Sequence, residues 1–280
     1  MRNLPIGVMD SGVGGLTVVS ELWRQLPSEQ ILFYGDSLRC PYGDREEMEI
    51  RRFTFKALDF LVSQGVKMLV IACNTATAVC LEEAKDRYSI PIIGVIGPGA
   101  RAAIAATEKQ KVGVIGTRAT IGSQSYPKTL HRTHQKIDVI SQACPGFVEL
   151  VERGPIDREV AMPMVTSALQ TFKGSEIDTM ILGCTHYPLL AKVIGEVLGP
   201  GVRLINSAEE TARDVSHWLT EHEMTRSDTN VPTHRFYTSG EVQRFTEIAT
   251  MWLGQKIAVS SYDVWDQEQR KQKESSCARR

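Results

Sequence analysis

Hydrophobic positions along the chain fall into two patterns that alternate from one end to the other. Short aliphatic and β-branched runs have almost no polar interruption, as in residues 31–35 (ILFYG) and 111–117 (KVGVIGT). Longer segments between them carry apolar residues on one helical face, as in 44–64. Uninterrupted short runs are typical of strands buried on both faces of a parallel sheet. The alternation therefore predicts βαβ units and an α/β fold.

The same patterns give approximate bounds for the individual elements. The predicted strands cover 5–9, 31–35, the run ending at Ala72, 90–96, 111–117, the run ending at Gly183, 202–207 and 234–240. The predicted helices begin near Leu16 and cover 44–64, 74–88, 100–109, 157–172, 189–198, 207–219 and 241–253. We expect Ser207 and Glu210 to form a capping box at the start of the helix over 207–219.

Two of the apolar runs end in the same way. Residues 66–77 read VKMLVIACNTAT and residues 177–188 read IDTMILGCTHYP, so each run stops at a small residue, a cysteine and polar side chains. Open α/β sheets bind ligands at the carboxyl ends of their strands. We therefore expect Cys73-Asn74-Thr75 and Cys184-Thr185-His186 to lie at equivalent strand tips, each supplying one thiol to a site between two similar halves.

A second repeat supports two halves. KVGVIGT at 111–117 mirrors PIGVMDS at 5–11, an alignment that sets Asp10 against Gly116 and Ser11 against Thr117. We interpret Gly97-Pro98-Gly99 as a break in the chain and predict two doubly wound parallel-sheet domains related by pseudo-twofold symmetry, with the site in the cleft between them. Residues 1–97 plus 208–265 would form the first domain and 98–207 the second. The charged tail, 266–280, should be disordered.

Several loops and turns carry candidate binding groups. The glycine-rich turn DSGVGG (10–15) should present backbone N–H groups at a helix N-terminus, which suits a carboxylate ligand better than a nucleotide because no phosphate-binding spacing is present. Asp10 is either a turn residue or a carboxylate that assists a catalytic group. Pro41-Tyr42-Gly43 is a turn that brings a hydroxyl and a bare backbone toward a ligand. Glu149 and Glu152 are predicted to be solvated.

Composition narrows the class of protein. The chain of 280 residues has 42% hydrophobic and 23% charged residues and a formal net charge of −1, which argues against a nucleic-acid or membrane partner and favours a small molecule. No run approaches the roughly 20 apolar residues of a membrane span, and structured chain is predicted too early to leave room for a signal peptide. Six scattered cysteines fit reduced thiols, so we expect a cytoplasmic protein.

Four chemistries could use the two strand-tip thiols. Cys73, Cys184 and His186 lack the paired short spacings of a structural zinc site, so no metal is expected. A cysteine hydrolase built on Cys184 and His186 would leave Cys73 unexplained. Two buried cysteines could also simply pack. Inversion of a carbon acid needs a base on one face and an acid on the other, and two facing thiols supply both. We expect at least one thiol to have a lowered pKa.

The motifs, taken together, resemble one family. The chain is similar to the glutamate racemases of the cofactor-independent aspartate/glutamate racemase superfamily from about Ile6 to Gly254. The motifs that carry the resemblance are DSGVGGL (10–16), YGDSLRCPYG (34–43), ACNTAT (72–77), GVIGT (113–117), CPGFVELVERG (144–154) and GCTHYPLL (183–190).

This resemblance implies interconversion of L- and D-glutamate without a cofactor or metal, which supplies D-glutamate for peptidoglycan, by a protein that is a homodimer. It implies that Cys73 and Cys184 are the acid/base pair and that Asp10 and His186 assist them. The residues implied to bind substrate are Asp10, Ser11, Tyr42, Gly43, Asn74, Thr75, Thr185 and His186. Asp36 and Glu152 match acidic positions without an assigned role, and Asn206 stands where the family pattern has aspartate. Another amino-acid racemase and a non-catalytic dicarboxylate-binding protein remain alternatives.

Overall fold

The computed structural model describes residues 1–266, which form two parallel β-sheets with helices on both faces of each. The first sheet contains, in order, β10 (Val259–Ser261), β9 (Arg235–Thr238), β2 (Ile31–Gly35), β1 (Ile6–Asp10), β3 (Met68–Ile71) and β4 (Ile92–Gly94). The second contains β6 (Asp138–Ala143), β5 (Lys111–Gly116), β7 (Thr179–Gly183) and β8 (Arg203–Ile205). Every strand pairing is parallel, which confirms the predicted α/β class. Beyond Asp266, the predicted disordered tail lies outside the described residues.

Both sheets share one strand order. The order β2-β1-β3-β4 in the first sheet repeats as β6-β5-β7-β8 in the second, and β9 and β10 extend only the first sheet. Cys73 follows β3 and Cys184 follows β7, so the two cysteines occupy equivalent places in the two halves. The shared order is consistent with the predicted pseudo-twofold relation.

Helices cover each sheet face with apolar side chains. On the first sheet, α1 (Leu16–Gln25), α10 (Ser207–Glu221) and α11 (Val242–Leu253) pack on one face, and α2 (Glu47–Ser63) and α3 (Asn74–Arg87) pack on the other. On the second sheet, α4 (Ile96–Ala106) and α6 (Ser125–Thr133) cover one face, and α7 (Phe147–Glu152), α8 (Arg158–Ala168) and α9 (Ala191–Leu198) cover the other. Strand residues alternate between the two cores, since Val8 and Val70 face α1 whereas Met9 and Ile71 face α2.

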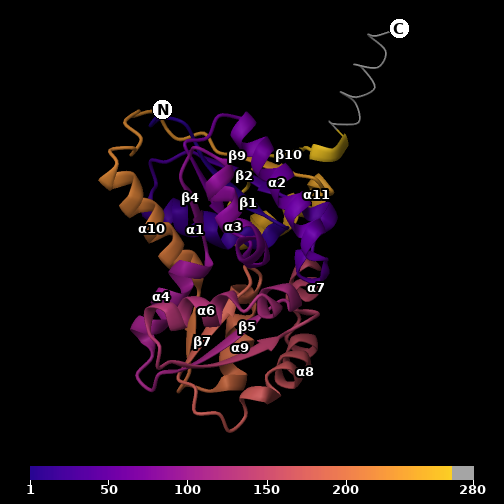
Figure 1. The fold of residues 1–280 in the computed structure, drawn as a ribbon. Helices are drawn as coiled ribbons and strands as arrows, with labels where there is room; N and C mark the ends of the chain where they lie inside the picture. Colours follow the sequence, from indigo (N-terminus) through magenta and orange to yellow (C-terminus); the bar gives the residue numbers. More distant parts are fainter. Residues whose placement is uncertain (267–280) are drawn as a thin grey trace.

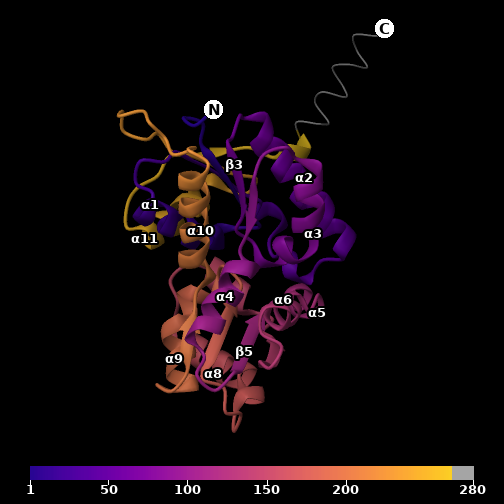
Figure 2. The same ribbon diagram turned by 60° about the vertical axis from the view of Figure 1, so that its left-hand side comes forward.

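The chain passes between the sheets twice, through β4–α4 and β8–α10. Figure 2 shows α10 beside α1 in the upper half, directly above α4. Buried residues of α10, among them Ala208, Ala212 and Val215, join the same core as α1. Among the described residues, no helix has the length and apolar character needed to cross a membrane.

Two local expectations are wrong. Gly97-Pro98-Gly99 does not break the chain: it lies in the first turn of α4, where the missing N–H of a proline costs no helical hydrogen bond. The predicted domain boundary between residues 97 and 98 thus falls inside a helix. Ser207 is not the cap of α10; Asn206 is, and its side chain accepts a hydrogen bond from the Ala208 N–H at 3.0 Å.

A buried ion pair holds the end of β3 that is opposite Cys73. The Lys67 ammonium lies 2.6 Å from Glu29 and also donates to the carbonyls of Arg2 and Met224. Both charged side chains are at most 1% exposed. Burial lowers the pKa of Lys67, and the Glu29 carboxylate opposes this effect. The pair therefore joins the N-terminus and the segment after α10 to the start of β3.

Replacing Lys67 with methionine should destabilise the fold far more than the same change at an exposed ion pair. Lys67→Met leaves the Glu29 carboxylate buried without its cation, at a cost of about 3–5 kcal/mol. Lys85→Met breaks a pair with Glu82 whose side chains are 45% and 83% exposed, and it should cost less than about 1 kcal/mol. Urea unfolding of both variants checks this, and equal losses would contradict it.

Candidate active site

The carboxyl ends of β1, β3 and β7 meet at the junction of the two sheets. Asp10 ends β1, and the pairing of Met9 with Ile71 brings it to the same edge as Cys73. From the other half, the Thr185 hydroxyl donates to Asp10 Oδ1 at 3.2 Å. The tip of β7 therefore contacts the tip of β1, which lies beside the end of β3 that precedes Cys73.

Cys73 is a buried thiol at the N-terminus of α3. Its sulfur accepts a hydrogen bond from the Ala76 N–H at 3.5 Å and lies 3.7 Å from the Ser11 hydroxyl oxygen. Burial, then the negative charge of Asp10, raises the pKa of Cys73, although the Ala76 N–H acts in the opposite direction. A charge on Cys184 raises it further. Cys73 is therefore not the thiol with the lowered pKa that the sequence predicts for at least one of the pair.

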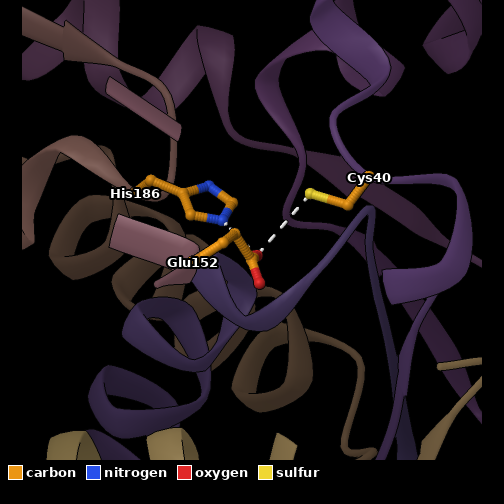
Figure 3. A group of neighbouring side chains, drawn as sticks. All are labelled: Cys40, Glu152 and His186. Carbon is orange, nitrogen blue, oxygen red and sulfur yellow. Dashed lines mark hydrogen bonds and ion pairs between the residues drawn. The ribbon is translucent and has the colours of Figure 1, made fainter. Parts of the chain in front are cut away.

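Cys184 belongs to a different set of polar groups. Its sulfur lies 3.7 Å from His186 Nδ1. His186 Nε2 lies 2.7 Å from Glu152 Oε1 (Figure 3). Burial alone would lower the pKa of His186, but its contacts with Cys184, Cys40 and Glu152 raise it well above the usual value. The imidazole is therefore charged and bonded to a sulfur on one side and a carboxylate on the other.

Asp10 has a strongly perturbed carboxyl group. It is fully buried, and Oδ2 accepts a hydrogen bond from the Gly12 N–H at 3.0 Å. Burial raises the pKa of Asp10 to about 6, although the His186 charge and the hydrogen bonds from Gly12 and Thr185 lower it. A carboxyl group with a pKa this close to neutrality can exchange a proton under physiological conditions, which suits an acid/base assistant better than a turn residue.

Glu152 is not the solvated carboxylate predicted from the sequence. Besides His186, Oε1 accepts a hydrogen bond from the Val13 N–H at 3.1 Å, across the junction of the halves. Burial raises the pKa of Glu152, but the His186 hydrogen bond and charge outweigh this and lower it. The glycine-rich turn thus does seat a carboxylate, as its backbone predicts, but the carboxylate belongs to the chain itself.

The two residues after Cys73, Asn74 and Thr75, are hydrogen-bonded to side chains of the second half. The Thr75 hydroxyl lies 2.9 Å from that of Thr117 and 3.1 Å from that of Thr120, both from the second half. The Tyr126 hydroxyl donates to Asn74 Oδ1 at 2.6 Å. Asn74 and Thr75 were expected at the site. Thr117 was indicated only by its alignment with Ser11, and the contacts of Thr120 and Tyr126 cross between elements that no local pattern relates.

Tyr42 and Gly43 approach the junction with their backbone. The Tyr42 hydroxyl donates to Asp36 Oδ2 at 2.6 Å, so this phenol is already hydrogen-bonded within the first half. Asp36 Oδ1 accepts hydrogen bonds from Arg39 and Ser239, and Asp36 therefore fixes the turn. A Cβ atom added to Gly43 would overlap the Thr117 side chain. Gly43 therefore lets the turn meet the second half at van der Waals distance.

One group of side chains has the composition of a metal site. Ligand atoms of Cys40, Glu152 and His186 lie within 4.8 Å of one another. However, Glu152 Oε1 is already bonded to His186 and Val13, and burial raises the pKa of Cys40 to about 12. A cation here would have to displace both hydrogen bonds and a tightly held thiol proton, so we interpret the group as a hydrogen-bonded chain that supports His186.

Comparison with known proteins agrees with this geometry. The family model for Asp/Glu/hydantoin racemases matches residues 6–215. A glutamate racemase of Exiguobacterium sibiricum is 50% identical over 96% of this chain and 99% of its own length, and one from Oceanobacillus iheyensis is 54% identical over 87% and 89%. The chain belongs to the glutamate racemase family. This confirms the predicted resemblance and the predicted enzyme class, an amino-acid racemase.

Solved structures of the family share the fold. Glutamate racemase RacE1 of Bacillus anthracis superposes with a TM-score of 0.91 at 48% identity, covering 94% of this chain and 98% of its own. The enzyme of Francisella tularensis, solved in complex with D-glutamate, gives 0.88 at 33% identity, covering 94% and 99%. The two-sheet architecture is therefore that of the family.

Replacing Gly43 with alanine should impair racemisation without unfolding the protein. The added methyl group must push the turn away from Thr117, and a displacement of about 1 Å at a site costs on the order of 100-fold in rate. Gly122→Ala, in α5 (Arg118–Gly122), adds a Cβ with nothing within 4 Å and should leave the rate unchanged. Rates and thermal midpoints of both variants check this, and equal activities would refute the steric argument.

Proposed function

We propose that the chain interconverts L- and D-glutamate by a two-base mechanism in which Cys73 and Cys184 act on opposite faces of the α-carbon, without a cofactor or a metal. The observation that carries the proposal is that the two thiols follow equivalent strands, β3 and β7, at the junction of the two halves, each with its own polar partners. The D-glutamate complex of the Francisella tularensis relative supports the substrate. The product would supply peptidoglycan synthesis.

The two thiols have different polar partners, which supports different roles for them. Cys73 is buried beside Asp10, so its proton is retained, and a charge on Cys184 strengthens that preference. A charged His186 lies 3.7 Å from the Cys184 sulfur and can donate a hydrogen bond to it. One thiol would then be the acid while the other is the base, as inversion requires.

Each remaining site residue has a role within this proposal. Ser11, Asn74, Thr75 and Thr185 would bind the substrate with their side chains, and Tyr42 and Gly43 with their backbone. Asp10 would exchange a proton beside Cys73, and His186 would exchange one beside Cys184. Glu152 would stabilise the protonated form of His186. As the family resemblance implies, we also propose that the protein is a cytoplasmic homodimer, which sedimentation of the purified protein would test.

Racemisation should occur with glutamate and need nothing added. Polarimetry on L-glutamate and, separately, on L-aspartate shows which amino acid the protein racemises. We expect loss of optical rotation from L-glutamate. A non-catalytic binding protein would leave both rotations unchanged. Activity that disappears in a chelator or copurifies with a pyridoxal absorbance band would contradict the absence of metal and cofactor.

Deuterium incorporation should distinguish two bases from one. Because the protonating thiol differs from the deprotonating one, product formed in D2O should carry α-deuterium from its first appearance, whereas recovered substrate stays protiated at low conversion. By family resemblance, Cys184 acts on L-glutamate and Cys73 on D-glutamate. Proton NMR of the α-position measures both pools, and early exchange into recovered substrate at the racemisation rate would eliminate the two-base mechanism.

Serine in place of either thiol should abolish racemisation in both directions, since every turnover needs both groups. Cys80→Ser and Cys144→Ser provide the control, because both are buried free cysteines outside the acid/base pair. Rates from each enantiomer check this. A Cys73→Ser or Cys184→Ser variant that retains wild-type rates from one enantiomer would contradict the proposal.

Removing the Glu152 carboxylate should shift the alkaline limb of the pH profile. Glu152 raises the pKa of His186, so His186 keeps its proton until the pH passes that raised value. In Glu152→Gln the imidazolium should be lost at lower pH, by about 1–2 units if a charge-assisted hydrogen bond of about 1.5–3 kcal/mol is removed. Glu149→Gln, on the same helix, is the control. If the alkaline limb of the kcat/KM profile of Glu152→Gln stays at the wild-type pH, Glu152 does not hold the proton of His186 during catalysis.

A further inference from the structure

A buried amide beside Cys73 has a donor without a partner. Asn74 is the first residue of α3 and is 2% exposed. Its Nδ2 atom is buried, and no hydrogen-bond partner for it lies among the described residues. Buried side-chain amides are nearly always bonded at both ends, so an unsatisfied donor next to a reactive thiol indicates a group reserved for a ligand.

The other end of the same amide is held from the second half. Tyr126, on α6, donates its hydroxyl to Asn74 Oδ1 at 2.6 Å. The phenol is 1% exposed, and burial raises its pKa, so it stays a donor throughout the working range of pH. An amide has one acceptor end and one donor end. With Oδ1 occupied by Tyr126, the two N–H bonds of Nδ2 have a fixed direction.

The Tyr126 ring is itself tightly placed. A Cβ atom added to Gly183 would lie 3.0 Å from Tyr126 Cε2, and one added to Gly99 would lie 3.4 Å from the hydroxyl oxygen. Gly183 directly precedes Cys184. One side chain therefore packs on the backbone beside one thiol and bonds the amide beside the other, so the donor on Asn74 is oriented only when the two halves are in register.

We propose that Tyr126 is a positioning residue, which fixes the Asn74 amide so that its Nδ2 hydrogens bind a carboxylate of the amino-acid substrate. This inference rests on the proposed function, because it assigns a task at the same site. In this role Tyr126 acts through Asn74, although its hydroxyl also has a hydrogen bond with Ser207. A carboxylate is the ligand class that two N–H donors and a nearby helix N-terminus favour.

Tyr126→Phe removes the hydroxyl and keeps the ring. The substrate carboxylate is bound in both the ground state and the transition state, so KM should rise with little change in kcat. The rise should be roughly tenfold, the ratio that corresponds to a lost buried hydrogen bond. Tyr88→Phe is the matched control, because the Tyr88 hydroxyl also donates a hydrogen bond of 2.6 Å to a side-chain oxygen, that of Asp59. Tyr88 follows the last residue of α3, which places it about 20 Å from Asn74 at a rise of about 1.5 Å per residue.

A double-mutant cycle separates positioning from general support of the fold. If Tyr126 acts through Asn74, adding Tyr126→Phe to Asn74→Ala should raise KM no further than Asn74→Ala alone. Multiplicative effects would overturn the proposal, as would an unchanged KM in Tyr126→Phe. Asn74→Asp gives a second route that leaves Tyr126 intact. It keeps an acceptor for the phenol but replaces the Nδ2 donor with a second carboxylate oxygen, which also repels the substrate carboxylate, so KM should rise at least as much as in Asn74→Ala.

The wild-type enzyme keeps the two levels of inference apart. If it does not racemise glutamate, the proposed function fails before any variant is made. If it does and Tyr126→Phe behaves like the Tyr88 control, only the positioning role fails. Asn74 variants that behave like this control would also remove Asn74 from the proposed substrate-binding residues. The enantiomers have equal free energies, so kcat/KM measured from L- and from D-glutamate must agree within each variant, which checks the data internally.

Discussion

The site depends on how closely the backbone of residues 12–15 approaches Thr185 and His186. A Cβ atom on Gly14 would lie 2.5 Å from His186 Nδ1, and one on Gly12 would overlap Glu152. The same contact carries the hydrogen bond from Val13 to Glu152. Because no side chains separate the two halves here, polar groups of one strand tip can bond those of the other. The proposed chemistry needs this proximity, and the glycines of the turn are what permits it.

Close approach also explains the electrostatics. Asp10 and His186 are both buried at the junction, where separation from water makes each charge act strongly on the other. A lone buried carboxylate would be very costly, yet the pKa of Asp10 rises only to about 6 because His186, Thr185 and backbone N–H groups offset burial. In the same way, the hydrogen bond to Glu152 offsets the effect of burial on the pKa of His186. The junction thus keeps ionisable groups near the point of proton exchange.

Sequence patterns predicted what is local and periodic. Apolar runs ending in Cys73 and Cys184 correctly gave two buried strands, because the sheet imposes burial on every strand residue. Glu152 was misread, since its helix pattern is compatible with solvent and its partner His186 is 34 residues away. Thr120 and Tyr126 were missed as contacts for the same reason. Gly97-Pro98-Gly99 misled because glycine and proline mark loops and helix starts alike.

The two halves are equivalent in topology but not in chemistry, and the reaction tolerates this. Cys73 has a hydroxyl and a carboxylate as neighbours, whereas Cys184 has an imidazole bonded to a carboxylate. Since the enantiomers have equal free energies, kcat/KM must be the same in both directions whatever surrounds each thiol. Unequal surroundings can therefore change kcat and KM for each enantiomer, but only in proportion, so that kcat/KM stays equal in the two directions. In the proposed two-base mechanism, the raised pKa of Cys73 would favour the form in which this thiol is the acid, so the asymmetry can bias the resting enzyme without biasing the equilibrium between the enantiomers.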